Sequence, residues 1–167
     1  NSGVLSITVT QRKPVLRFQT SEYGFYCDSD GFLLPLQPNF STDVPIVDGN
    51  IPLDLTDCVK GRPEDPADAQ WLDNVLALAK HINSSSIWKD RIAQINSNEK
   101  GELTIVPKDG NEIFLFGHPE EIESKFEKMQ IYYERIVAEK GEDAYDKVDL
   151  RYRKQIVCTN SEQKKKK

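Results

Sequence analysis

The fold of this chain is decided by residues 103–116, which read LTIVPKDGNEIFLF. Two runs of apolar and β-branched residues, 103–106 and 113–116, flank a segment that contains Asp109-Gly110. Because an Asp-Gly pair readily adopts the positive φ angles of a tight turn, the pattern predicts a β-hairpin. This is the strongest hairpin signal in the chain, and it indicates that antiparallel pairing builds much of the fold.

Short extended runs precede the hairpin. Alternation of apolar and polar residues is typical of a half-buried strand, and Asp28-Ser29-Asp30-Gly31 is a second hairpin turn signal. Together these patterns predict strands at residues 4–10, 15–18, 23–27, 32–36, 44–47 and 87–96.

Two longer segments show helical periodicity. The first begins with Asp65-Pro66, a capping residue followed by proline at the first helical position, and runs to about residue 83. The second begins within residues 117–121, where a proline and two glutamates suit the first turn of a helix, and ends at Gly141. Each has one apolar stripe, which predicts packing against a sheet. In the second helix that stripe is Ile122, Phe126, Met129, Tyr133, Ile136 and Val137.

Two strands are predicted after the second helix, VDLRY at 148–152 and QIVC at 155–158. The order of strand groups and helices favours an α+β fold, a mainly antiparallel sheet with two long helices packed on one face. A strand that closes a domain often lies at a sheet edge, where unpaired N–H and C=O groups can pair with another chain.

Composition narrows the possible functions. The chain has 167 residues, a length that fits one domain or one domain plus a fragment. Its net charge is −5 and its pI is about 5.1. Binding to nucleic acid requires a dense basic face, and the sequence shows none. The densest run of basic residues is the four lysines at 164–167, which are typical of a solvated tail. We therefore expect no nucleic-acid partner.

The sequence lacks the usual signs of catalysis or metal binding. His81 and His118 are the only histidines, and no nucleophile motif or glycine-rich phosphate loop occurs. Cys27, Cys58 and Cys158 are too widely spaced for a metal site. Asp28-x-Asp30-Gly31 fits a turn better than a calcium loop, which needs a third acid before its glycine. We expect a chain that is not an enzyme and has no cofactor or metal.

The start of the sequence suggests a piece of a longer protein. It begins without Met, close to the strand-like run at 4–10, and no run of about 20 apolar residues occurs. Any membrane anchor is expected upstream. We also expect residues 4–10 to be disordered or paired with a neighbouring molecule, because their apolar face needs a partner.

Several motifs, in order, resemble the bacterial cell-division proteins FtsQ and DivIB. Lys13-Pro14-Val15-Leu16-Arg17 is similar to the family's x-Pro-x-Ala/Leu-Arg element, and Tyr26-Cys27-Asp28-Ser29-Asp30-Gly31 to its Val-Asp-x-x-Gly hairpin. Residues 43–49 resemble its Leu-Pro-x-Leu-x-Gly segment, and residues 148–152 its Asp-Leu-Arg-Tyr element. The resemblance implies that residues 1–12 are the last strand of a POTRA domain, 13–160 a β domain with a bent sheet, and 161–167 a disordered basic tail.

The resemblance also implies a function. Members of this family are single-pass proteins of the bacterial inner membrane, and this fragment would lie on the periplasmic side. It would be a non-catalytic divisome scaffold that docks the coiled-coil division proteins FtsB and FtsL through its last strand. Arg151 and Tyr152 would be the first contacts. The pairing edge would run over Lys154, Gln155, Ile156 and Cys158. Arg153-Lys154-Gln155 departs from better-known members, which have small or acidic residues there.

Other interpretations remain open at this point. A periplasmic enzyme or small-ligand binder on an α+β fold would show a deep pocket with convergent polar groups, whereas a docking module would show an exposed last strand. An outer-membrane assembly factor associated with POTRA domains is a third possibility. Within the docking hypothesis, the alternative for the site is that Tyr152 belongs to the core and Arg151 is merely solvated.

Overall fold

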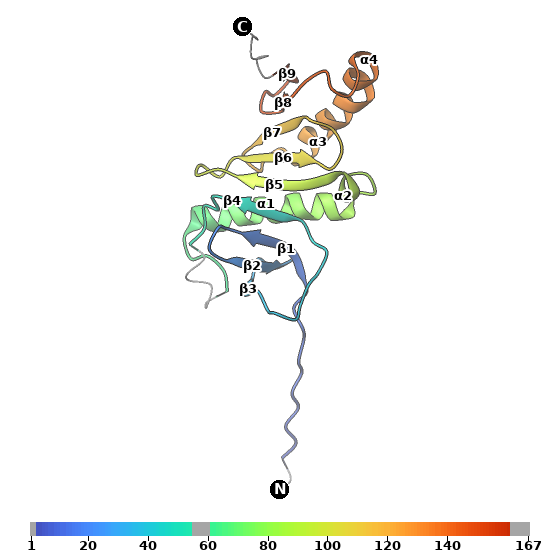
Figure 1. Ribbon diagram of the computed structural model, residues 1–167. Coiled ribbons are helices and arrows are strands. Elements are labelled where there is room, and N and C mark those ends of the chain that lie inside the picture. The colour runs from blue at the N-terminus through green and yellow to red at the C-terminus, as the bar shows by residue number, and fades with distance from the viewer. Residues whose placement is uncertain (1–2, 55–60, 161–167) are drawn as a thin grey trace.

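The strands of the described residues form one nine-stranded sheet (Figure 1). The computed structural model describes residues 3–54 and 61–160. The strand order is β3-β2-β1-β4-β5-β6-β7-β8-β9. The strands are β1 (Pro14–Gln19), β2 (Gly24–Asp28), β3 (Leu33–Pro35), β4 (Ile46–Gly49), β5 (Ile92–Ser97), β6 (Leu103–Pro107), β7 (Ile113–Gly117), β8 (Lys147–Asp149) and β9 (Val157–Thr159).

The sheet is mixed, so the expectation of a mainly antiparallel sheet is matched only roughly. Hairpin neighbours such as β6 and β7 pair antiparallel, as the Asp109-Gly110 turn predicts. Three pairs are parallel, namely β1 with β4, β4 with β5, and β7 with β8. The last two parallel pairs arise because a helix, not a tight turn, connects their strands.

Helices cover one face of the sheet. The helical elements are α1 (Pro66–Ser84), α2 (Trp88–Arg91), α3 (Ile122–Ile131), the π-helix η2 (Tyr132–Val137) and α4 (Ala138–Lys140). The α+β class is confirmed, and Figure 1 shows α1 and α3 behind the sheet. Parallel strand–helix–strand connections are right-handed in about 98% of cases. Both connections move the same way along the sheet between strands that point the same way, so this rule places both helices on the same face.

The start of α1 follows the local sequence. The Asp65 carboxylate accepts hydrogen bonds from the backbone N–H groups of Ala67 and Asp68, at 2.8 and 3.1 Å. Pro66 occupies the first helical position, where its missing N–H costs nothing. The buried stripe of the helix is Leu72, Val75, Leu78, Ala79 and Ile82.

The core is continuous between the two long helices and the sheet. Phe126 of α3 stacks on His81 of α1 at 4.5 Å between ring centroids. The same ring lies 5.3 Å from Trp88 and 5.7 Å from Phe116 of β7. His81 is thus part of the packing between helices.

Asp28 closes the predicted turn at residues 28–31. Its side chain accepts hydrogen bonds from the backbone N–H groups of Asp30 and Phe32, at 3.0 and 2.8 Å, and from Arg12 at 2.5 Å. Gly31 has a φ of 77°, as the turn requires. Burial acts to raise the pKa of Asp28, but these hydrogen bonds outweigh it and lower the pKa. The turn hypothesis is confirmed, and Arg12 ties the preceding segment to the domain.

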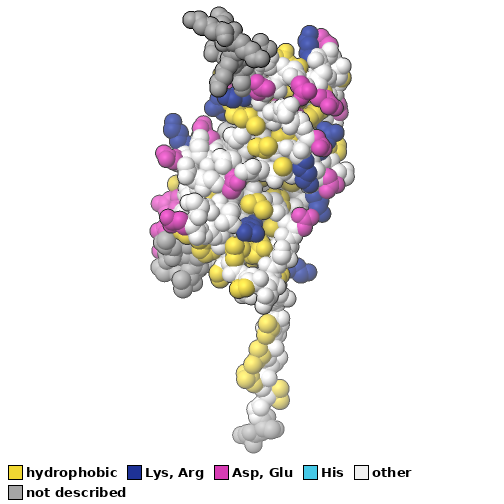
Figure 2. Space-filling view, in the orientation of Figure 1, with side chains coloured by type: hydrophobic (Ala, Val, Ile, Leu, Met, Phe, Trp, Pro, Cys, Tyr) yellow, Lys and Arg dark blue, Asp and Glu magenta, His cyan; other side chains and the backbone are white. Residues whose placement is uncertain are grey.

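Several predicted elements differ from the structure. Residues 4–10 form no strand, and Val4, Leu5, Ile7 and Val9 are 74% to 93% exposed on a projecting segment (Figure 2). The predicted strand at 87–96 begins only at Ile92, after the short helix α2. The second long helix begins at Ile122, so Pro119 precedes it. Cys58 and the tail at 161–167 lie outside the described residues.

At the start of the π-helix η2, the structure buries a different tyrosine from the one predicted. The predicted stripe contained Tyr133, but Tyr132 is the fully buried residue and Tyr133 is half-buried. Tyr132 follows the buried Met129 by three residues, and its N–H still donates to the carbonyls of Lys128 and Met129, so it lies on the same face of the helix as Met129. The Tyr132 hydroxyl consequently has no hydrogen-bond partner among the described residues, whereas the Tyr133 hydroxyl donates to Glu112 at 2.7 Å.

These neighbouring tyrosines should respond oppositely to the loss of their hydroxyl groups. Tyr132→Phe removes an unsatisfied buried hydroxyl and should raise the free energy of unfolding by about 1 kcal/mol. Tyr133→Phe leaves the buried Glu112 carboxylate without its donor and should lower it by about 1–2 kcal/mol. Urea denaturation of both variants measures the difference, and a Tyr132→Phe protein less stable than Tyr133→Phe would contradict the assignment.

Candidate docking site at the last strand

Strand β9 ends the sheet, and its outer edge is open in the part of the chain that the structure describes. It is the last strand in the sheet order and pairs antiparallel with β8 alone. The register sets Val157 opposite Asp149, Cys158 opposite Val148, and Thr159 opposite Lys147. An edge strand of this kind can accept another strand through its backbone.

The hydrogen bonds of β8 indicate which backbone groups of β9 face outward. The N–H of Ile113 donates to the carbonyl of Asp146 at 2.9 Å, and the N–H of Leu150 donates to the carbonyl of Leu115 at 3.1 Å. Val148 lies between these two residues and therefore bonds toward β7, which turns Lys147 and Asp149 toward β9. The N–H of Asp146, just before the strand, donates to the carbonyl of Thr159 at 3.1 Å. By the register, Val157 and Thr159 bond toward β8. The N–H and C=O of Cys158 then point to the open edge.

Arg151 and Tyr152 lie in the loop that joins β8 to β9. The predicted strand at 148–152 ends at Asp149, and Leu150 is fully buried. Tyr152 is 49% exposed, so the alternative that places it in the core is wrong. Lys154 and Gln155 are exposed in the same loop, and Ile156 and Cys158 are half-buried.

A bidentate ion pair holds the start of this loop. The Nε and Nη2 atoms of Arg151 donate to the two carboxylate oxygens of Asp149, at 3.0 and 2.7 Å. The backbone N–H of Arg151 also donates to Asp149, at 3.0 Å. The hydrogen bonds from Arg151 hold the pKa of the Asp149 carboxyl below its usual value, against the opposing effect of burial. Arg151 is therefore fixed by its own chain, and not merely solvated.

Gly117 leaves the space that the Arg151 side chain occupies. This glycine at the end of β7 has a φ of 75°, and a Cβ atom there would lie 2.8 Å from Cγ of Arg151. Any other residue would be strained and would displace the arginine stem. The loop after β8 thus depends on the loop after β7.

Lys128 of α3 holds the same loop through hydrogen bonds to its backbone. Its ammonium group donates to the backbone carbonyls of Leu150 and Tyr152, at 3.0 and 2.6 Å. No local pattern signals this role, because the lysine lies more than 20 positions from either carbonyl. Asp149, Gly117 and Lys128 are the three residues at this site that sequence reasoning missed.

The described residues show little sign of metal chemistry or of a membrane span. Within residues 3–54 and 61–160, no three histidine, cysteine, aspartate or glutamate side chains are grouped so that they can hold a metal ion. Of the helices in those ranges, none has the length and apolar content needed to cross a membrane.

Comparison with known proteins identifies the family. A family model described as FtsQ/DivIB, C-terminal related, matches residues 13–159. The chain therefore belongs to the FtsQ/DivIB family, whose members are membrane-anchored, non-enzymatic cell-division proteins. No curated protein matches the chain.

Asp149→Asn tests the ion pair. The variant keeps an acceptor for the Arg151 N–H but loses the charge, so the free energy of unfolding should fall by about 1 kcal/mol, since Arg151 is half-exposed to solvent. Because the pKa of Asp149 is lowered in the folded state, this contribution should be present above about pH 4 and disappear as the pH falls toward the folded-state pKa.

Urea denaturation between neutral and acidic pH measures this effect, with Asp90→Asn, an exposed aspartate of α2, as the matched control. A difference between wild type and Asp149→Asn that grows toward low pH would contradict the ion-pair assignment.

Proposed function

We propose that this domain docks a partner division protein of the FtsB or FtsL type through its last strand. The observation that carries the proposal is the open edge of β9 next to the exposed ring of Tyr152. A partner segment in extended conformation would add a tenth strand, with Cys158 supplying outward N–H and C=O groups. Membership in a cell-division family supports a partner from the division machinery.

Side chains around the edge would add specificity. Tyr152 offers a large half-exposed ring, and aromatic residues are frequent hot spots of protein interfaces. The exposed side chains of Arg151, Arg153 and Lys154 lie beside it. This positive group favours a partner segment with acidic residues, which would also speed association. The hydrogen bonds of Asp149 to Arg151 use Nε and Nη2, so the Nη1 atom of that guanidinium is left for a partner carboxylate.

The arrangement of the chain suits a membrane-anchored scaffold. The N-terminal segment leaves the domain near β1, β2 and β3, whereas β9 lies at the opposite end of the sheet (Figure 1). We propose that residues 1–12 continue a preceding POTRA domain and that an upstream anchor fixes the protein in the inner membrane. The docking edge would then face away from that connection, on the periplasmic side, where a coiled-coil partner can reach it.

Tyr152→Ala tests the proposed anchor residue. Binding of the periplasmic segment of the FtsB-type partner, measured by calorimetric titration, should weaken by about 2 kcal/mol or more. The free energy of unfolding should change by less than about 1 kcal/mol, since the ring is half-exposed. Unchanged binding, or a large loss of stability, would contradict the role of Tyr152.

A proline in β9 tests whether the partner pairs with the backbone of this strand. Cys158→Pro removes the outward N–H without removing a bond to β8, and edge strands tolerate proline best. It should abolish strand addition, while Cys158→Ser, which keeps the N–H, should bind as wild type does. Equal binding by the two variants would show that the partner does not pair with β9.

A further inference from the structure

A second candidate site lies at the other end of β7. A cavity of about 240 Å³ is lined by Arg91, Pro107, Asp109, Gly110, Glu112, Tyr133, Val137 and Glu142. These residues come from α2, the end of β6, the β6–β7 turn, η2 and the segment before β8. Since Glu112 precedes β7 and Gly117 ends it, the cavity and the β9 docking site lie at opposite ends of one strand.

The floor of the cavity holds a buried carboxylate. Glu112 is only 2% exposed, and its Oε1 atom accepts a hydrogen bond from the Tyr133 hydroxyl at 2.7 Å. Its Oε2 atom accepts no hydrogen bond from the residues that the structure describes. Burial, followed by the hydrogen bond to Glu112, raises the pKa of Tyr133, so this hydroxyl stays protonated and remains a donor.

Gly110 makes room for that carboxylate. Its φ of 101° is a glycine conformation, and a Cβ atom there would lie 2.3 Å from Oε2 of Glu112. Oε2 thus lies against bare backbone at the cavity wall. A carboxylate on a side chain that is only 2% exposed is poorly solvated, and a ligand that supplies a positive donor to Oε2 would offset that desolvation.

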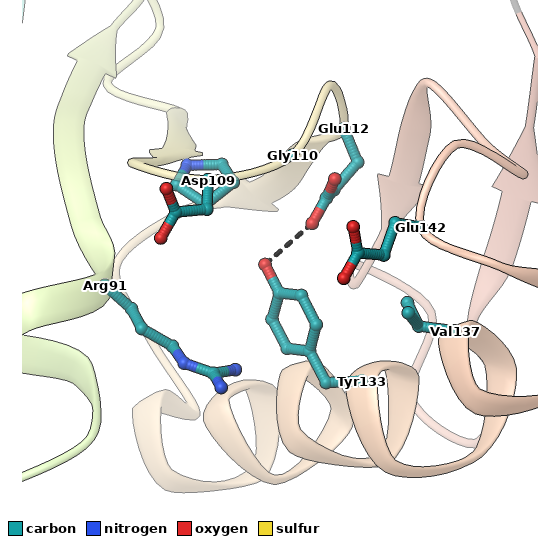
Figure 3. A pocket seen from close by; sticks show the side chains of 8 residues that line it. Arg91, Asp109, Gly110, Glu112, Tyr133, Val137 and Glu142 are labelled. Carbon is teal, nitrogen blue, oxygen red and sulfur yellow. Dashed lines mark hydrogen bonds between the residues drawn. The ribbon is translucent and has the colours of Figure 1, made fainter.

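The charge around the cavity is negative. Figure 3 shows Tyr133 pointing toward Glu112, with Glu142 beside that carboxylate and Arg91 and Asp109 on the other side. Arg91 lies over the Tyr133 ring, at 4.9 Å from its centroid, and forms no ion pair with the three cavity carboxylates. Three carboxylates therefore face one guanidinium that does not neutralise them.

We infer that this cavity binds a guanidinium or ammonium group carried by a side chain of a partner protein. Among the described residues, no three acidic, histidine or cysteine side chains are grouped so that they can hold a metal ion, and an organic cation is the ligand class that we assign. The cavity is smaller than the roughly 300–1,000 Å³ of pockets for drug-sized ligands. Its size suits one side chain better than a cofactor. Asp109, Gly110 and Glu142 are exposed, so a side chain can enter from solvent.

Nuclear magnetic resonance titration of the purified domain tests the inference. The probes are N-acetyl-arginine amide, N-acetyl-lysine amide, spermidine and the neutral N-acetyl-citrulline amide. The charged amino-acid probes should cause saturable shifts of the Gly110 and Glu112 amide signals, and citrulline should not. Equal shifts with citrulline, no saturable shifts with either amino-acid cation, or saturation by spermidine alone would overturn it.

Matched variants locate the binding. Glu112→Gln keeps the shape of the side chain and an acceptor for Tyr133 but loses the charge. It should weaken the binding of N-acetyl-arginine amide about tenfold or more. Glu142→Gln, at the exposed rim, should weaken it without affecting folding, and Arg91→Gln should tighten it by removing a like charge. Glu123→Gln in the first turn of α3 is the control and should bind as wild type does. Loss of binding in the control to the same extent as in Glu112→Gln and Glu142→Gln would overturn the site.

Discussion

Two helical crossovers constrain the whole structure. Helix α1 joins the parallel strands β4 and β5, and α3 with η2 joins the parallel strands β7 and β8. Because these connections have one hand, both helices lie on one face and share a core in which Phe126 touches α1, α2 and β7. The sheet continues beyond the strands that the helices connect, and its last strand, β9, forms one edge. The exposed edge is thus a consequence of how the core is built.

The loop between β8 and β9 is held by that core. Leu150 anchors it in the interior, Lys128 of α3 binds two of its carbonyl groups, and the Asp149–Arg151 pair closes its start. These contacts order the backbone before any partner arrives, which lowers the entropic cost of binding. Tyr152 is consequently presented from a rigid loop, and its exposure reflects the fold around it.

Local signals in the sequence predicted local structure well. The Asp109-Gly110 hairpin and the Asp65-Pro66 helix start need only a few neighbouring residues, and both are confirmed. The parallel pairing of β4 with β5 and β7 with β8 depends on contacts across whole helices, so alternation patterns alone suggested a mainly antiparallel sheet. The choice between Tyr132 and Tyr133 is a similar case, since both follow Met129 at helical spacing and only the packing decides which one is buried.

The candidate site was predicted in part for the same reason. The last strand and the exposure of Tyr152 followed from its position at the end of the chain, but the end of β8 at Asp149 did not. Lys128, Gly117 and Glu112 act through contacts that join distant segments. Side chains of this kind carry no local pattern, and only the assembled sheet brings them to their partners.

The central claim is that β9 offers its outer edge to a partner strand. Residue-resolved hydrogen exchange of the domain, free and bound to its division partner, tests this most directly. The account predicts that the amide of Cys158 exchanges rapidly in the free domain and becomes protected in the complex, while the amides of Val157 and Thr159 are protected in both. Rapid exchange of the Cys158 amide in a saturated complex would contradict it.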